Sequence, residues 1–93
     1  MTIRPGKAAE NAEILGLQAL AWLAGEDGAL ERLLAASGMD RAGLKAAAER
    51  PETLGAVLEF LLMDESLLLA FCDESGTDPK DVHRARHVLE AGG

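Results

Sequence analysis

The stretch VLEFLLMDESLLLAFC, residues 57–72, decides the fold. It is the longest apolar region of the chain, but Glu59, Asp64 and Glu65 interrupt it. A membrane-spanning helix needs at least about 18 consecutive apolar residues, and the sequence has no charge-free segment of that length. Asp64 can instead begin a helix, because its carboxylate can accept hydrogen bonds from the free backbone N–H groups of a first turn. The stretch therefore predicts two core helices joined by a turn.

The composition predicts one small all-α domain. Sixteen Leu and 17 Ala stand against only five Ile and Val among the 93 residues. A chain of this length can bury one hydrophobic core and is too short for two independent ones. We therefore expect a single helical domain over residues 1–93, frayed at residues 1–6 and 91–93.

Glycine, proline and helix-capping aspartate residues divide the chain into a compact bundle of five to six short helices. The expected helices cover residues 7–24, 29–37, 41–50, 52–63, 65–75 and 80–90. The first carries two apolar stripes, and we expect it to be the central, most buried helix. One stripe contains Ile14, Leu17, Leu20, Ala21 and Ala24, and the other contains Leu15, Ala19 and Trp22.

Two halves of the sequence are similar at an offset of 38 residues. Residues 14–48 and 52–86 are identical at seven of 35 aligned positions. Aligned pairs include Trp22 with Phe60, Gly38 with Gly76 and Asp40 with Asp78. These matches predict two three-helix pseudo-repeats. The alternative is that short helical hairpins with Gly ends and Asp caps look alike without any duplication.

Each half also carries a Ser-Gly-x-Asp turn followed by an apolar residue, which is the spacing of a helix-turn-helix. The turns are residues 37–40 and 75–78, followed by Leu44 and Val82, and the basic residues after them are Arg41, Lys45, Arg50 and Lys80, Arg84, Arg86. A DNA-associated regulator with a basic last helix is therefore the alternative hypothesis, and it requires Lys80, Arg84 and Arg86 to project from one face. The net charge of −7 opposes it, because an acidic protein repels phosphate. We expect plain helix packing and no nucleic-acid partner.

Pairs of titratable side chains are explained more simply by helix capping and solvent exposure than by metal binding or acid–base catalysis. His83 and His87 are spaced i, i+4, as two metal ligands would be, but without a third ligand a solvated helix face explains them. The acidic pairs Glu26-Asp27 and Asp64-Glu65 are expected to cap helix N-termini rather than to act as acids and bases. We assign no metal ligand.

Nucleophiles are equally few. Cys72 lies on an apolar stripe, where burial raises the pKa of a thiol, and is expected to pack inertly. Ser37, Ser66 and Ser75 lie at helix ends outside any nucleophile motif. We therefore expect no enzyme activity and assign no catalytic residue, cofactor or known small-molecule ligand.

A surplus of large apolar side chains in the fourth and fifth helices indicates a contact surface. Leu61, Leu62, Met63, Leu67, Leu68, Leu69 and Phe71 surround both helices, more than one buried face of each can hold. We expect part of residues 61–71 to be exposed as a patch, as at an interface. The lone cysteine and the absence of an apolar N-terminal run predict a cytoplasmic location without membrane attachment. The favoured function is a small cytoplasmic protein-interaction or adaptor domain that binds another protein or itself.

Several segments are similar to a known group: QALAWLA at residues 18–24, RLLA at 32–35 and DESLLLAF at 64–71, with Leu30 and Ser37-Gly38 between them. From Ala12 to Leu89 the chain resembles the small bacterial proteins of domain-of-unknown-function family 3572. The resemblance implies a compact helical protein of the bacterial cytoplasm with no assigned activity, cofactor or catalytic residue. It therefore transfers no site residue to this sequence.

Overall fold

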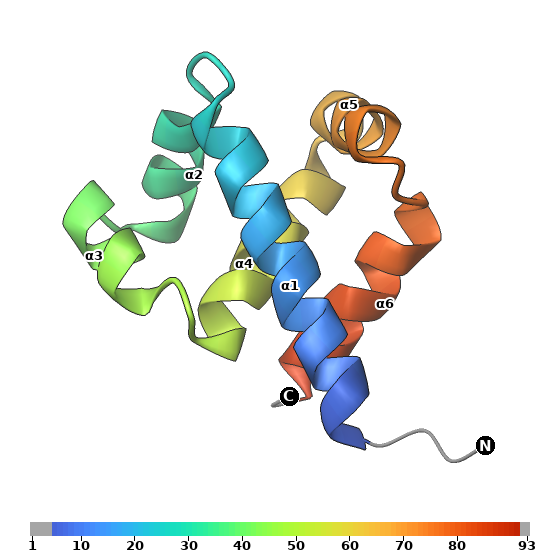
Figure 1. Cartoon of the computed structure of the whole chain (residues 1–93). Coiled ribbons are helices and arrows are strands. Elements are labelled where there is room, and N and C mark those ends of the chain that lie inside the picture. Colours follow the sequence, from blue (N-terminus) through green and yellow to red (C-terminus); the bar gives the residue numbers. More distant parts are fainter. Residues whose placement is uncertain (1–4, 92–93) are drawn as a thin grey trace.

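The computed structural model describes residues 5–91, with side chains from Ala8 onward, and contains six α-helices there (Figure 1). They are α1 (Pro5–Ala24), α2 (Ala29–Ser37), α3 (Arg41–Ala47), α4 (Pro51–Met63), α5 (Glu65–Ser75) and α6 (Pro79–Glu90). No strand occurs within this range, so the expected all-α bundle is confirmed. The fraying expected at residues 1–4 and 92–93 lies outside the described residues, whereas residues 5 and 6 belong to α1. None of the described helices combines the length and hydropathy needed to span a membrane.

Local signals set the helix boundaries. The expected bounds of α2 and α5 are confirmed, while α4 and α6 begin one residue earlier than expected, at a proline, which is well suited to a first helical position. The expectation for α3 was wrong, because this helix ends at Ala47 and not at Arg50. Pro51 disfavours helical backbone at the preceding residue, and Arg50 is extended, with ψ 134°.

Aspartate and glycine caps hold the ends of the helices. The carboxylate of Asp40 accepts a hydrogen bond from the Gly43 N–H at 2.7 Å, and that of Asp78 accepts one from the Lys80 N–H at 2.8 Å. Gly38 and Gly76 end α2 and α5 in the left-handed conformation, with φ 75° and 72°. These local bonds satisfy N–H and C=O groups that a helix end leaves free.

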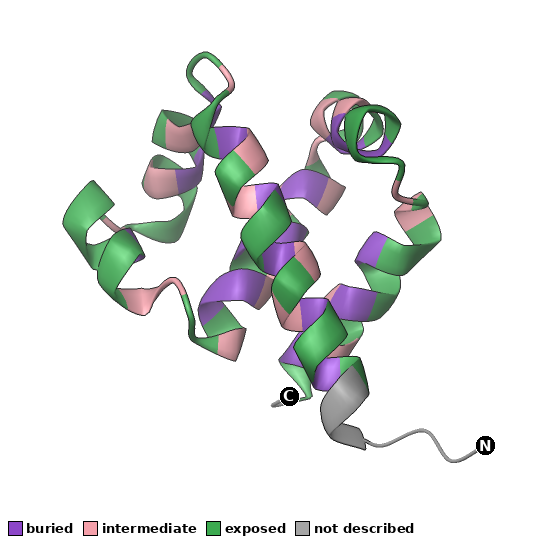
Figure 2. Cartoon of the chain, in the orientation of Figure 1, coloured by how far each residue is buried: buried purple, intermediate pink, exposed green. Residues whose placement is uncertain are grey.

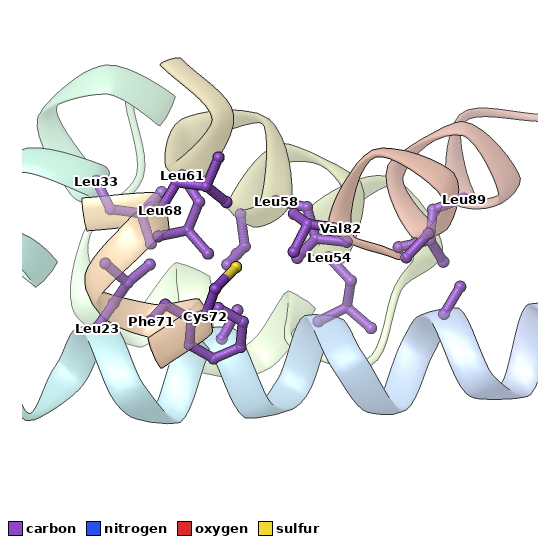
Figure 3. Close-up of a cluster of buried hydrophobic side chains, with 14 of the residues drawn as sticks. Leu23, Leu33, Leu54, Leu58, Leu61, Leu68, Phe71, Cys72, Val82 and Leu89 are labelled. Atoms are coloured by element: carbon purple, nitrogen blue, oxygen red, sulfur yellow. The ribbon is translucent and has the colours of Figure 1, made fainter. Parts of the chain in front are cut away.

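The core forms around α4, which contacts α1, α2, α5 and α6. Its buried side chains are Thr53, Leu54, Val57, Leu58 and Leu61. In Figure 3 the leucines of this set lie in one cluster with Val82 of α6 and with Phe71 and Cys72 of α5. The central helix is therefore α4, and the expectation that α1 is the most buried helix was wrong.

The buried face of α1 consists of small residues up to Ala19, followed by Leu23. Ala12, Gly16, Ala19 and Leu23 are buried at spacings of four, three and four residues. A Cβ added at Gly16 would lie 2.8 Å from the Cβ of Leu54, so the backbones of α1 and α4 approach more closely than any residue with a side chain would allow at this position. This contact turns the opposite side of α1, with Ile14 and Leu17, outward.

The first of the two expected stripes, which a fully buried α1 would have hidden, is thus mostly solvent-exposed. Ile14 and Leu17 are 47% and 40% exposed, and Ala21 and Ala24 are exposed as well. The second expected stripe is buried or half-buried, and the Trp22 ring packs edge-on against Phe71, with the ring centres 5.6 Å apart. The prediction of the second stripe is therefore confirmed and that of the first was wrong.

The two halves share their turns but not their packing. Gly38 and Gly76 have matching conformations, and so do the capping residues Asp40 and Asp78. However, α6 packs extensively against α1 and α4, whereas α3 makes only minor contacts with the other described helices. Figure 1 accordingly shows α3 at the edge of the molecule. The duplication is not shown by this arrangement and stays a prediction.

The substitution Gly16→Ala should destabilise the fold by about 1–3 kcal/mol, because the added methyl group would overlap Leu54 and push α1 away from α4. The matched control is Gly55→Ala in α4, whose added Cβ would meet Leu89 at an ordinary 3.5 Å. That control should be neutral or stabilising by up to about 1 kcal/mol, since Ala is the better helix former. Chemical denaturation followed by circular dichroism measures both. Equal effects of the two substitutions would contradict the close approach.

Candidate functional site

The exposed side of α1 carries no charge along its second half. We call this surface the uncharged face of α1; its residues are Ile14, Leu17, Gln18, Ala21 and Ala24. It belongs to residues 14–25, the longest stretch of the sequence without Asp, Glu, Lys or Arg. Figure 2 shows the exposed residues of α1 on the side turned toward the viewer. Large aliphatic side chains on a surface without charge are typical of the centre of a protein interface.

The apolar patch expected in residues 61–71 is mostly inside the protein. Leu61, Leu68 and Phe71 are buried, and only Met63 and Leu69 of the expected set are largely exposed, at 80% and 51%. Leu61, Leu68 and Phe71 are covered because α5 packs against α4 and α6, and because Phe71 also contacts Trp22 of α1. Sequence reasoning thus missed the exposed face of α1, and the charge-free run of residues 14–25 was the signal that could have found it.

Asp64 links three elements at the α4–α5 junction. One carboxylate oxygen accepts the Leu67 N–H at 3.2 Å, which confirms the predicted cap of α5. The other oxygen forms an ion pair with Arg32 of α2, whose guanidinium carbon lies 5.8 Å from the centre of the Phe60 ring. The hydrogen bond from Arg32, followed by that from Leu67, lowers the pKa of Asp64 below its ordinary value. Both oxygens of the Asp64 carboxylate therefore serve the fold, one by capping α5 and the other by pairing with Arg32.

The expectation that the side chains of Glu26 and Asp27 cap the N-terminus of α2 was wrong. The N-cap of α2 is Gly28, which has φ 74° and no side-chain cap. Glu26 contributes its backbone C=O, which accepts the Ala29 N–H at 3.2 Å. Because Gly28 can adopt the left-handed conformation at little cost, the turn closes through the backbone and leaves both carboxylates free of the cap.

The basic residues of the last helix do not form one surface. Lys80 and Arg84 are neighbours on the exposed side, but Arg86 points about 120° away from Lys80 around the helix and lines a groove with Glu52 and Glu59 of α4. Two of these cations also have carboxylate partners: Arg84 lies 3.3 Å from Asp81 and Arg86 lies 3.4 Å from Glu90. The common basic face that DNA reading by α6 requires is therefore not formed.

On α3, Arg41 lies 3.4 Å from Glu31 of α2, while Lys45 and Arg50 are exposed. The helix that would carry these cations into a groove is only seven residues long and ends before Arg50. The second helix of the first helix-turn-helix-like pair, α3, is thus about one turn shorter than expected.

The remaining candidate groups do not converge. His83 and His87 are both exposed, and within residues 5–91 no three His, Cys, Asp or Glu side chains come together as metal ligands would. The hydroxyl groups of Ser37 and Ser75 donate to the backbone carbonyls of Leu34 and Phe71, at 3.2 and 2.6 Å. These two serines therefore finish helix ends, and Ser66 lies exposed in the first turn of α5.

Two surface grooves are lined by both apolar and charged side chains. One groove, of about 490 Å³, lies between α1 and α6 and includes Leu15, Val88 and the ion pair Asp81–Arg84. A second groove, of about 440 Å³, lies between α2 and α4 around Phe60. Asp81 pairs with Arg84 in the first groove and Arg32 with Asp64 in the second, where Glu59 is a further exposed acid. Within the described residues, no ion pair joins this acid to a base at a common point in either groove.

Cys72 is buried, and burial raises the pKa of its thiol, with smaller contributions from the negative charges of Asp78 and Asp81. Since the thiolate is the reactive form, a disulfide reagent should modify Cys72 in the native protein at least an order of magnitude more slowly than in denaturant. The exposed control is Ser66→Cys combined with Cys72→Ala, which should react rapidly without denaturant. Fast native modification of Cys72 would show that the thiol is accessible and activated.

The Arg32–Asp64 pair should make stability depend on pH in the acid range. A carboxyl whose pKa is lowered by folding contributes stability above its ordinary pKa, and this contribution is lost as the pH falls through the folded-state value. The substitution Arg32→Gln should raise the pKa of Asp64 toward its ordinary value, as measured by carboxyl carbon chemical shifts in an NMR titration. Arg84→Gln, which removes a cation paired with Asp81 instead, should leave Asp64 unchanged. An unaltered titration of Asp64 without Arg32 would contradict the assignment.

Comparison with known proteins gives a family but no activity. The family model described as a protein of unknown function (DUF3572) matches residues 9–92, which is nearly the whole chain. No curated protein and no solved structure matches the chain significantly. The resemblance noted in the sequence is thereby confirmed: this chain belongs to the DUF3572 family of proteins of unknown function.

Proposed function

We propose that this domain is a small protein-interaction or adaptor domain that acts without catalysis and binds its partner through the uncharged face of α1. The observation that supports this is the exposure of Ile14 and Leu17 within a charge-free surface. Each apolar Å² removed from water stabilises a complex by roughly 25 cal/mol. A partner that covers these two side chains gains this energy without having to desolvate a charge.

The stability of the fold does not account for these residues. The core contact of α1 uses Ala12, Gly16, Ala19 and Leu23 on the opposite side. A polar side chain at position 14 or 17 would serve the helix equally well, because helix propensity differs little among long unbranched residues. Exposed apolar groups that the fold does not need are typical of a contact surface.

The absence of catalysis in this proposal is supported by how the reactive groups are used. Asp64 is held by Arg32 and by the α5 cap, and Ser37 and Ser75 bond to backbone carbonyls. An enzyme site needs an acid or base and a nucleophile directed at a common point. We also assign the domain to the bacterial cytoplasm, where its lone buried thiol, Cys72, would stay reduced.

The DNA-associated regulator is the weaker alternative. It would have to bind phosphate with a chain of net charge −7, although the guanidinium groups of Arg84 and Arg86 lie near carboxylates and on different sides of α6. A fluorescence-anisotropy titration with duplex DNA at low salt addresses it directly, since phosphate contacts are strongest there.

Leu17→Glu tests the proposed surface in cells. A tagged copy is cross-linked in the native host, purified, and its partners are quantified by mass spectrometry against the control Ala35→Glu. Ala35 is exposed on α2, so both substitutions add one negative charge to an exposed helix position. Leu17→Glu should reduce the recovery of the main partner at least about tenfold, because a carboxylate placed in an apolar contact loses its hydration.

Ala35→Glu should retain that partner, and circular dichroism should show that both variants keep the helical fold. Unchanged recovery with Leu17→Glu would show that the uncharged face of α1 is not the binding surface, and the proposed function would lose its support.

A further inference from the structure

We propose that the partner of the uncharged face of α1 is the same face of a second copy of this chain, in an antiparallel two-fold dimer. This inference rests on the proposed function, because it uses the same surface and names its occupant. Two features of the described residues support it: the distribution of charge over the helices and the order of large and small residues along α1. A third, the position of the acidic residues that flank the face, opposes association and sets how the dimer should respond to salt.

Charge distinguishes the uncharged face of α1 from the surfaces of the other helices. Residues 14–24 of α1 include no charged side chain, and the exposed acid of this helix, Glu10, precedes the face. Each of the other described helices exposes at least one charged side chain: Glu31 on α2, Arg41 on α3, Glu59 on α4, Glu65 on α5 and Asp81 on α6. In a two-fold contact the same patch faces itself, so a charged patch would bring like charges together. A chain with a net charge of −7 can therefore meet its own copy most readily through the uncharged face of α1.

The face is also complementary to itself in shape. Its N-terminal half carries the large residues Ile14 and Leu17, and its C-terminal half carries the small residues Ala21 and Ala24. Two antiparallel copies related by a two-fold axis near position 19 would place Leu17 of one copy against Ala21 of the other, and Ile14 against Ala24. Large residues would then fill the space beside small ones at four places, as interdigitated helix packing requires.

The acidic residues at both ends of the face set the expected salt dependence. Glu10 and Glu13 precede it, and Glu26 and Asp27 follow it. In an antiparallel dimer the N-terminal acids of one α1 approach the C-terminal acids of the other. Added salt screens this repulsion, so the dimer should tighten as salt rises. A contact between the basic side of α6 and an acidic surface would weaken under the same conditions.

The substitution pair Leu17→Ala and Ala21→Leu tests the geometry. Sedimentation equilibrium of the untagged full chain at low and high NaCl gives the dimer dissociation constant. Either single substitution should weaken dimerisation at least about tenfold, one by leaving a gap and the other by setting Leu against Leu. The double variant exchanges the large and small positions, and two-fold symmetry should restore the dimer to within about threefold of the parent. Ala35→Leu is the control and should leave the dissociation constant unchanged.

The outcomes separate this inference from the proposed function. A monomer at all salt concentrations up to about 1 mM protein would overturn the dimer, while loss of a different protein with Leu17→Glu would still support the proposed function. A dimer that persists in Leu17→Glu would overturn this inference alone, because self-association would then use another surface, whereas the proposed function is contradicted only by unchanged recovery of the partner with Leu17→Glu. Failure of the double variant to recover, with its helical content intact by circular dichroism, would overturn the antiparallel register.

Discussion

The close approach of α1 to α4 at Gly16 is the constraint on which the exposed surface of this protein depends. With no side chain at Gly16, the backbone of α1 comes close to Leu54. The residues that share its side of the helix, Ala12 and Ala19, are small enough to follow it into the contact. A helix that buries its small residues must expose what lies opposite, and here that is the stripe with Ile14 and Leu17. Core packing thus determines where the apolar surface is.

Helix boundaries in this chain could be predicted from sequence because they depend on neighbouring residues. The cap by Asp40 reaches three residues along the chain and that by Asp78 only two, and the glycines that end α2 and α5 need only their own backbone freedom. The turn after α1 shows the limit of this reasoning. Glu26 and Asp27 look like capping residues, yet the backbone conformation of Gly28 closes the turn without them.

The orientation of α1 could not be predicted in the same way, because it depends on a helix that begins almost 30 residues later in the chain. Both sides of α1 are apolar, so periodicity alone does not decide which side faces the core. What selects the correct side is the distance between two backbones, which a single sequence does not reveal. The surplus of leucines in α4 and α5 was misleading for a related reason: Phe71 and Leu68 contribute to a core shared with α1, α4 and α6, so other helices cover these side chains.

The same distribution of residues bears on how an acidic chain associates selectively. Charges on α2 to α6 make most encounters between copies unfavourable, and they keep such surfaces hydrated. The uncharged face of α1 has no such charges within residues 14–25, although polar substitutions on this face would not disturb the contact at Gly16. An exposed apolar surface that lacks charges and is not required by the packing of the core is best explained by a partner that covers it. Because the large residues of that face lie in its N-terminal half and the small residues in its C-terminal half, an antiparallel second copy of the chain would place large residues against small ones.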